Sequence, residues 1–447
     1  MMKFIPNSCI KDEMLKILGY NNINDLFDDI PSSIRIDNLN ISSSKSQQEV
    51  EYHLRRIASK NRTYYDTPCF IGGGQPHYVP SVVKSILSRS EFYTAYTPYQ
   101  PEASQGFLQA MFEYQSMITE LTGMDISNAS LYDGATALGE AALMSHRINK
   151  KPVFLISECV SHEKKSVLRN YTKGAGITIR EVPYNEEEGT VDIDALSGMI
   201  SSEVSGVYIE NPNFFGIFEE DAEEVGKIVH DNESLFIVGV DPFTLGIVKK
   251  PGEYNADIVI GEGRGLGTTM ELGGCGLGIF SCKNEFLRQI PGRIIGMSKD
   301  SNGKRAFCMT MQTREQHIRR EKATSNICTN EGLCALAAVV YLAWLGEEGL
   351  EEIGRINLER GHMLSDSISS INGFERVFRG VHFNEFVMRY KDDPHVLNKN
   401  LLKHGFQGGL ILSSFNPDFD NCLLFGVSEI QTDDQITGFL KTLREVA

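Results

Sequence analysis

From Val153 to Phe280 the chain alternates short apolar runs with longer stretches of helical periodicity, and this alternation restricts its fold more than any other feature. The predicted strands are Val153–Ile156, Ile177–Val182, Gly206–Ile209, Leu235–Val240, Ala256–Ile260 and Gly276–Phe280. The predicted helices are Ala135–Arg147, Lys164–Thr172, Ile193–Ile200 and Asp221–His230. Repeated strand, crossover helix and strand predict an α/β fold with a mostly parallel sheet that helices cover on both faces.

The pattern differs on either side of this region. Residues 1–65 are polar and helical in pattern, with an amphipathic stretch at Glu49–Lys60, and are predicted to form an N-terminal helical arm. A Gly- and Pro-rich passage then opens the large α/β domain, predicted to span residues 66–329. From Asn330 a long apolar helix leads into short strands, so residues 330–447 are predicted to be a smaller C-terminal α+β domain.

Composition excludes several classes of function. The chain has 43 Lys and Arg against 59 Asp and Glu, a formal net charge of −16, which argues against nucleic acid and anionic membranes as partners. The most apolar stretch, Leu333–Leu345, is shorter than the roughly 20 residues that cross a bilayer, and the N-terminus has no signal-peptide pattern. The 9 cysteines are scattered without a C-x-x-C pair, so no metal site is predicted. We expect a cytoplasmic enzyme or enzyme subunit.

The loop Asp133–Ala137 precedes a predicted helix and is built from small residues. Its unpaired N–H groups, together with the hydroxyl of Thr136, could bind a phosphate. The alternative is an ordinary helix N-cap made by Asp133.

Two further residues follow predicted strands. Asp241 ends the strand Leu235–Val240 and precedes Pro242, where a carboxylate could hold the protonated ring nitrogen of pyridoxal phosphate. His162 follows the strand Val153–Ile156 and could stack on a flat cofactor ring. The alternatives are a cap or turn aspartate and a solvated or hydrogen-bonded loop histidine.

Phosphate loop, stacking residue and ring-nitrogen aspartate, in this order, resemble the fold-type I pyridoxal-phosphate enzymes. Those enzymes carry a Schiff-base lysine after the next strand, but here the loop Gly261–Gly274 contains none. Lys249 and Lys250 lie too close to Asp241, and Lys283 lies beyond the following strand. The sequence therefore predicts no catalytic lysine in this chain.

Longer runs carry a closer resemblance. They are Tyr96–Gly106, Thr122–Ala137, Asn211–Gly216, Asn255–Gly267 and, most specifically, Gln312–Ala338. These runs resemble the glycine decarboxylase family of the glycine cleavage system, in particular the alpha branch of its two-chain form. The resemblance implies a pyridoxal-phosphate transferase fold and a beta subunit that carries the lysine and holds the cofactor. It also implies a heterotetramer of two alpha and two beta chains.

The implied reaction is decarboxylation of glycine, with transfer of the remaining aminomethyl group to the lipoyl group of the H-protein. Such a subunit would exclude water and position groups around the partner's cofactor, and Tyr96, Thr97, Tyr99 and Gln100, aromatic and polar residues on a Pro-bounded loop, are the candidates for this role; a packed interface loop without substrate contact is the alternative. Asp133, Thr136, His162 and Asp241 would be remnants of a second cofactor site. Two other functions stay open: a stand-alone enzyme that uses Lys249 or Lys250, and a purely structural or regulatory subunit.

Overall fold

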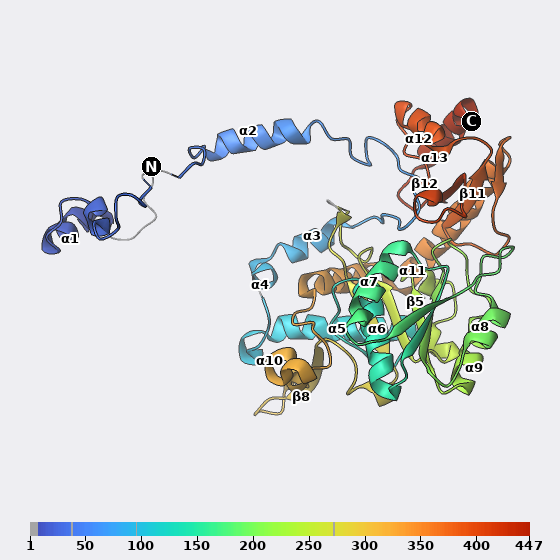
Figure 1. Ribbon diagram of the computed structural model, residues 1–447, viewed down its shortest axis with the longest axis horizontal. Coiled ribbons are helices and arrows are strands. Elements are labelled where there is room, and N and C mark those ends of the chain that lie inside the picture. Colours follow the sequence, from blue (N-terminus) through green and yellow to red (C-terminus); the bar gives the residue numbers. More distant parts are fainter. Residues whose placement is uncertain (1–7, 37–38, 95, 271–272) are drawn as a thin grey trace. The chain divides into compact units, whose positions relative to one another are not determined.

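The computed structural model describes residues 8–36, 39–94, 96–270 and 273–447 (Figure 1). It divides into two compact units, Met1–Arg62 and Thr63–Ala447. The predicted domain boundaries after residues 65 and 329 stay predictions, because the units divide at Arg62 and are not divided again near residue 330.

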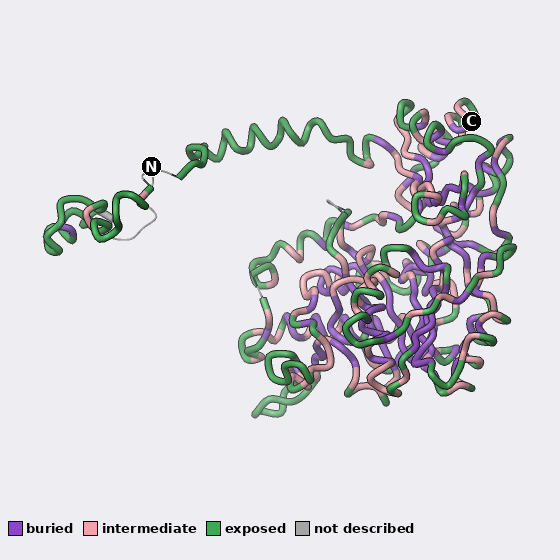
Figure 2. The backbone as a smooth tube through the Cα atoms, in the orientation of Figure 1, coloured by how far each residue is buried: buried purple, intermediate pink, exposed green. Residues whose placement is uncertain are grey.

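The first unit contains helices α1 (Lys11–Ile17) and α2 (Gln47–Ala58). The predicted helix Glu49–Lys60 is confirmed, but it begins two residues earlier because Ser46 caps it. The Ser46 hydroxyl accepts from the Glu49 backbone N–H at 3.3 Å, and the Glu49 carboxylate accepts from the Ser46 N–H at 2.8 Å, which makes a capping box. Every residue of α2 is exposed (Figure 2).

A large, mostly parallel sheet forms the centre of the second unit. Its strands are β1 (Ile126–Ser127), β2 (Val153–Ser157), β3 (Thr178–Val182), β4 (Val204–Asn211), β5 (Leu235–Val240), β6 (Ile258–Glu262) and β7 (Gly278–Cys282). The strand order is β1-β7-β6-β5-β4-β2-β3. Strands β6, β5, β4, β2 and β3 are parallel, whereas β7 is antiparallel to both of its neighbours.

The helices of this unit connect and cover the strands. They are α3 (Ser81–Leu87), α4 (Ser90–Tyr93), α5 (Gln105–Thr122), α6 (Gly134–Asn149), α7 (His162–Lys173), α8 (Ile193–Met199), α9 (Ala222–Asp231), α10 (Gln316–Arg319), α11 (Gly332–Ser369), α12 (Pro394–Lys403) and α13 (Asp433–Val446). On β2, Phe154 and Ile156 pack in the core beneath α6 and α7. Val153 and Leu155 point to the opposite face and pack with α8 and α9. The apolar runs are continuous because both faces are buried.

All six predicted strands and four predicted helices are present, with ends that differ by up to two residues. The last of the predicted strands, Gly276–Phe280, corresponds to β7. The sequence did not reveal the short strand β1 or the hairpin of β8 (Ile294–Lys299) and β9 (Arg305–Thr310). Strand β6 also runs two residues beyond its predicted end, so that Glu262 belongs to it.

A second, antiparallel sheet follows α11. Its order is β10-β11-β13-β12, formed by Phe374–Arg376, Glu385–Tyr390, Cys422–Gly426 and Leu410–Ile411. It packs with α12, α13 and the end of α11 around a core that includes Phe70, Phe425 and Phe439. The predicted α+β character of residues 330–447 agrees with these elements.

Helix α11 is long and kinked. Gly346, with φ 69°, interrupts its helical backbone. One 18-residue stretch of α11 has a mean hydropathy of 1.5, which meets the length and composition of a membrane span, and 39% of that stretch is buried. Ala335, Ala338 and Tyr341 pack in the core beside the main sheet, so α11 is explained as a core helix.

Candidate functional site

A cavity of about 470 Å³ lies at the carboxyl ends of the parallel strands. The ends of β4, β5 and β6, the first residues of α6 and α7, the strand β11 and the glycine run Gly72–Gly74 all contribute to its lining. Ligands of α/β proteins bind at this edge of the sheet, so this cavity is where a cofactor site of the predicted kind would lie.

The cavity is acidic. The carboxylates in its lining are Glu163, Glu210, Asp241, Glu262 and Glu385, and its cationic side chains are Lys164 and Arg264, with His77 as a titratable neighbour. Within the part of the chain that the structure describes, no group of three or more His, Cys, Asp or Glu side chains is placed to hold a metal ion.

The predicted phosphate loop is a capping box. The Asp133 carboxylate accepts from the Thr136 N–H at 2.7 Å, and the Thr136 hydroxyl accepts from the Asp133 N–H at 3.1 Å. The structure therefore brings Asp133 and Thr136 together. It places both of them outside the described lining of the cavity, to which only Gly134 of this loop contributes.

Glu262 occupies the start of helix α6 from the cavity side. One of its oxygens accepts from the Gly134 N–H at 2.9 Å. The other accepts from the N–H groups of Arg264 and Leu277, each at 2.9 Å. A helix N-terminus attracts an anion, and here the chain supplies that anion itself.

Asp241 lines the cavity as predicted for a residue at the end of β5. It accepts from the Phe243 N–H at 2.9 Å. Burial raises the pKa of Asp241, although His77 and Lys164 oppose this effect. His77 stacks on Phe243 with ring centroids 3.6 Å apart, so an aromatic ring of the chain itself lies close to this carboxylate.

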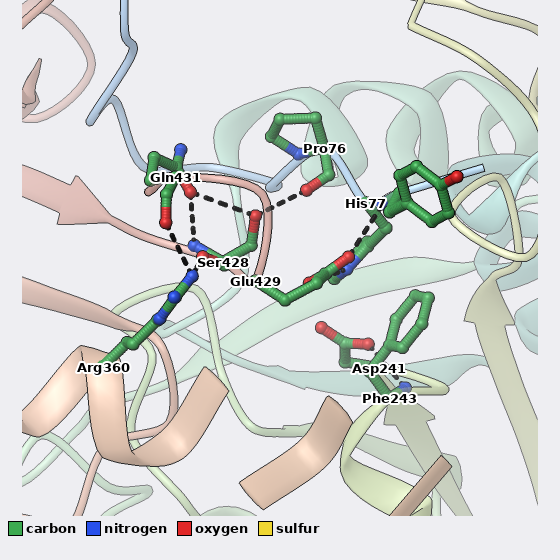
Figure 3. Close-up of polar contacts among 9 residues, drawn as sticks. Pro76, His77, Asp241, Phe243, Arg360, Ser428, Glu429 and Gln431 are labelled. Atoms are coloured by element: carbon green, nitrogen blue, oxygen red, sulfur yellow. Dashed lines mark hydrogen bonds and ion pairs between the residues drawn. The ribbon is translucent and has the colours of Figure 1, made fainter. Parts of the chain in front are cut away.

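The other side of His77 contacts the residues that follow strand β13 of the second sheet (Figure 3). Its Nδ1 lies 3.0 Å from a carboxylate oxygen of Glu429. Burial raises the pKa of Glu429, but the hydrogen bond and charge of His77, together with backbone N–H groups such as that of Tyr78, outweigh burial, so that this pKa is lowered. Nearby, the Ser428 hydroxyl donates to the Pro76 carbonyl at 2.6 Å. These contacts fix the segment that carries His77.

Lys164 is the one lysine among the described residues of the lining. Its ammonium lies 2.5 Å from Glu210, which also accepts from the Tyr208 hydroxyl at 2.7 Å. Burial alone would lower the pKa of Lys164, but Glu210, Glu262 and Asp241 outweigh burial and raise it. Lys164 is therefore a paired ammonium ion and has no free amine for Schiff-base chemistry.

The other lysines near Asp241 and the strands that follow it in the sequence lie elsewhere. The Lys249 side chain is 65% exposed and pairs with Glu223 at 3.6 Å. Lys283 pairs with Asp257 at 2.5 Å. Lys249, Lys250 and Lys283 all lie outside the described lining of the cavity.

His162 begins α7, but Ser161, Glu163 and Lys164 around it line the cavity and His162 does not. Its ring centroid lies 6.2 Å from that of Phe415, which is a lining residue. The histidine that stacks on an aromatic ring beside Asp241 is His77, which is not among the predicted site residues.

The residues of the cavity do not fit pyridoxal phosphate. The N–H groups of Gly134 and Thr136, which would receive a phosphate, already bind the carboxylates of Glu262 and Asp133. The loop Gly261–Gly274 supplies no lysine, and Lys164 is committed to Glu210. A phosphate would meet two fixed negative charges there, so this chain is not built to hold the cofactor.

The predicted interface loop lies apart from the cavity. Tyr96 is 80% exposed, Tyr99 is 48% exposed and Gln100 is also exposed. Arg293 donates to the Thr97 hydroxyl at 3.2 Å and to the Tyr99 hydroxyl at 3.0 Å. The structure therefore brings Thr97 and Tyr99 together on one guanidinium.

Sequence reasoning missed Glu262, Lys164, His77 and Arg293. Glu262 had a usable signal, since it follows the predicted strand Ala256–Ile260 at the edge where ligands bind. Arg293 had none, because it precedes a hairpin that the sequence did not predict.

Comparison with known proteins connects this geometry to a family. The family model described as "Glycine cleavage system P-protein" matches residues 2–443. Proteins named "Probable glycine dehydrogenase (decarboxylating) subunit 1" are similar along their whole length. The one from Thermococcus onnurineus is 47% identical and that from Desulfitobacterium hafniense is 44% identical, with at least 99% of each chain covered.

Solved structures agree. The crystal structure of a glycine decarboxylase (P-protein) of the glycine cleavage system, in inhibitor-bound form, superposes with a TM-score of 0.90 at 37% identity and covers 100% of both chains. A sphingosine-1-phosphate lyase from Burkholderia pseudomallei has a TM-score of 0.68 at 14% identity, covering 93% of this chain and 94% of its own. The second similarity concerns the fold alone.

Proposed function

Because the chain belongs to the glycine cleavage system P-protein family, we propose that it is the alpha subunit of a two-chain glycine decarboxylase whose pyridoxal phosphate is held by a beta subunit. Family membership makes the chain a glycine decarboxylase subunit with the fold of the pyridoxal-phosphate enzymes. The proposal concerns the division of labour between the two chains.

One observation carries this division: in the cavity that would hold the cofactor, the N–H groups and the lysine that it needs are already paired with carboxylates of the chain. Glu262 and Asp133 bind the N–H groups at the start of α6, and Lys164 is paired with Glu210. Pyridoxal phosphate needs a lysine with a free amine and an open anion site, whereas Lys164 is paired with Glu210 and the N–H groups at the start of α6 already bind carboxylates. The name "subunit 1" of the relatives supports a second chain that provides both.

The assembled enzyme would decarboxylate glycine and pass the remaining aminomethyl group to the lipoyl group of the H-protein. This chain would help to exclude water and to position groups at the partner's site through the loop of Tyr96, Thr97, Tyr99 and Gln100. Exposed aromatic rings next to fixed hydroxyl groups favour this role, because Tyr side chains supply large contact area with a polar end.

We propose an assembly of two alpha and two beta chains that meets the lipoylated H-protein in the cytoplasm. The net charge of −16 supports partners other than nucleic acid.

Chemical trapping tests the division of labour. The chain alone and the chain with its beta subunit are mixed with pyridoxal phosphate and reduced with borohydride, and each labelled lysine is mapped by mass spectrometry. We expect label on beta alone and glycine–CO₂ exchange only in the mixture. A stoichiometric adduct on this chain, at Lys249 or Lys250 for example, would show a stand-alone enzyme and contradict the proposal.

A purely structural or regulatory role is tested on the assembled enzyme. Substitution of Tyr96, Thr97 and Tyr99 together is expected to reduce exchange while the complex still forms. If exchange is unchanged, the loop lies outside the site and the chain acts only as a scaffold.

A further inference from the structure

We infer that Arg293 is a positioning residue that fixes the loop Tyr96–Gln100 from behind and turns the hydroxyl hydrogens of Thr97 and Tyr99 outward. This inference rests on the proposed role of that loop at the partner's site. To that role we add Arg293, the arrangement of the two hydroxyl donors, and the chemistry of the partner's surface that these donors would contact.

Arg293 is buried, with 4% of its surface exposed, although it carries a permanent charge. Its main chain is fixed, because its carbonyl accepts from the Ala129 N–H at 2.8 Å. Two residues further on, Ile295 exchanges two hydrogen bonds with the buried amide of Gln115, at 2.8 and 3.0 Å. The guanidinium therefore extends from a rigid base to the underside of the loop.

Burial of a guanidinium is costly unless its donors are used. Arg293 donates to the hydroxyl oxygens of Thr97 and Tyr99, and its guanidinium carbon lies 5.3 Å from the centre of the Tyr99 ring. These contacts hold both side chains and the turn between them, in which the Tyr99 N–H donates to the Thr97 carbonyl at 2.8 Å. An arginine in this place is explained by the loop it holds.

The direction of these hydrogen bonds decides what the loop presents. A guanidinium has donors and no acceptor, so Thr97 and Tyr99 must act as acceptors toward Arg293. Each hydroxyl keeps its own hydrogen, which then has to point elsewhere. With Tyr99 half-exposed and the positive charge behind both oxygens, the loop presents two polarised O–H donors, which fit oxygen acceptors such as carboxylates on the partner's surface.

The counter-charge of Arg293 comes from the segment with the most specific family resemblance. Glu315 lies 3.8 Å from the Arg293 Nε, and both atoms are buried without a hydrogen bond among the described residues. At this distance the two groups attract each other by charge but form no hydrogen bond. The other N–H groups of the guanidinium are directed to the loop. The far end of the loop is held separately by Gln105, which donates to the Pro101 carbonyl at 2.7 Å.

The test uses the assembled alpha–beta enzyme and measures assembly, kcat and KM for glycine in the exchange reaction. We expect Arg293→Met to assemble and to lower kcat by about 100-fold, the scale of a misplacement near 1 Å. Arg293→Lys keeps a charge with fewer fixed donors and should recover about tenfold. The control, Arg360→Met, removes a partly buried arginine that donates to the carbonyls of Ser428 and Gln431, and kcat should stay within about twofold.

A double-mutant cycle separates positioning from general stabilisation. If Arg293 acts through Tyr99, Tyr99→Phe lowers kcat by about tenfold in the wild-type background and has little further effect beside Arg293→Met. Multiplicative effects, or a kcat for Arg293→Met equal to that of Arg360→Met, would overturn the inference. If the Arg293→Met variant does not assemble, the same double-mutant cycle is measured with Arg293→Lys and Tyr99→Phe, and the same outcomes support or overturn the inference. A wild-type mixture without exchange activity contradicts the proposed function instead.

Discussion

The cavity and the Tyr96–Gln100 loop use buried charge in opposite ways. In the cavity, the carboxylates of Glu262 and Glu210 are directed inward, to the start of α6 and to Lys164. At the loop, the buried Arg293 is directed to two side chains that lie near the surface. The first arrangement pairs charges of the chain with one another, and in the second, by the inference above, the two hydroxyl groups would donate to another molecule. Together with the proposed function, the difference teaches that a fold could occupy its own site with its own charges and still contribute to the site of a partner.

The largest expected effect tests whether the cavity wall tolerates change. A Cβ on Gly216 would lie 1.9 Å from the Glu385 carbonyl oxygen, and its φ of 84° is unfavourable for other residues. Gly216→Ala should lower the free energy of unfolding by about 4 kcal/mol, through overpacking and backbone strain. Gly174→Ala, where nothing lies within 4 Å, is the control and should change it by less than about 0.5 kcal/mol in denaturant titrations. Equal losses would mean that the wall is not rigid.

The second prediction concerns Glu140, which connects α6 to the segment between α10 and α11. It is fully buried, accepts from the Ser325 hydroxyl at 2.7 Å, and burial raises its pKa to about 7. Because this pKa lies above that of the unfolded chain, the folded state binds the proton more tightly. The stability of the wild type should therefore fall as pH rises through the window from the ordinary value of 4.5 to about 7.

Glu140→Gln has no proton to lose and should avoid this loss. Its advantage over the wild type should grow by about 1.4 kcal/mol per pH unit within that window and approach about 3 kcal/mol at pH 8. Thermal or denaturant unfolding of both proteins at pH 5 and pH 8 measures it. An advantage that is the same at both pH values would show that Glu140 does not titrate there.

The third prediction tests the carboxylate at the start of α6. Glu262→Ala leaves the N–H groups of Gly134, Arg264 and Leu277 without their acceptor, which should cost about 1–3 kcal/mol. Millimolar inorganic phosphate should then raise the melting temperature of the variant and leave that of the wild type unchanged. If phosphate does not raise the melting temperature of the variant, Asp133 alone excludes anions from this position.

The smallest expected effect contrasts the two regions directly. In the assembled enzyme, Tyr99→Phe should lower exchange by about tenfold, equal to about 1.4 kcal/mol, because one outward donor is lost. Asp241→Asn changes the cavity without changing its shape and should leave exchange within about twofold of the wild type. Exchange assays at saturating glycine measure both. If Asp241→Asn lowers exchange more than Tyr99→Phe, the cavity and not the loop takes part in the reaction.

The sequence predicted the sheet well because local pattern determines it. Buried parallel strands such as β2 and β5 are continuous apolar runs, and their crossover helices are amphipathic, so both can be recognised without tertiary information. Strand β7 was found as a strand but not as antiparallel, since direction depends on pairing between distant segments. The β8–β9 hairpin is not predicted, because β8 is apolar only in its first residues and becomes polar and exposed toward the turn.

The site was predictable only where a residue follows a strand. Asp241 lies in the cavity as the end of β5 suggests, whereas the role of Glu262 depends on its contact with Gly134, 128 residues away in the chain. Arg293 meets Tyr99 across 194 residues. His162 was chosen for its place after β2, but the direction of its side chain is set by the first turn of α7, and the neighbouring Lys164 points inward instead. Such pairings need the folded chain.

The carboxylate of Glu262 has a consequence for how the protein is made. A protein that binds a small molecule only when folded gains stability in proportion to the logarithm of that molecule's free concentration. Here the start of α6 is completed from within the chain as soon as β6 is in place. Newly synthesised chains can therefore complete this helix start without a bound cofactor, and under the proposed function the supply of pyridoxal phosphate would concern the beta subunit.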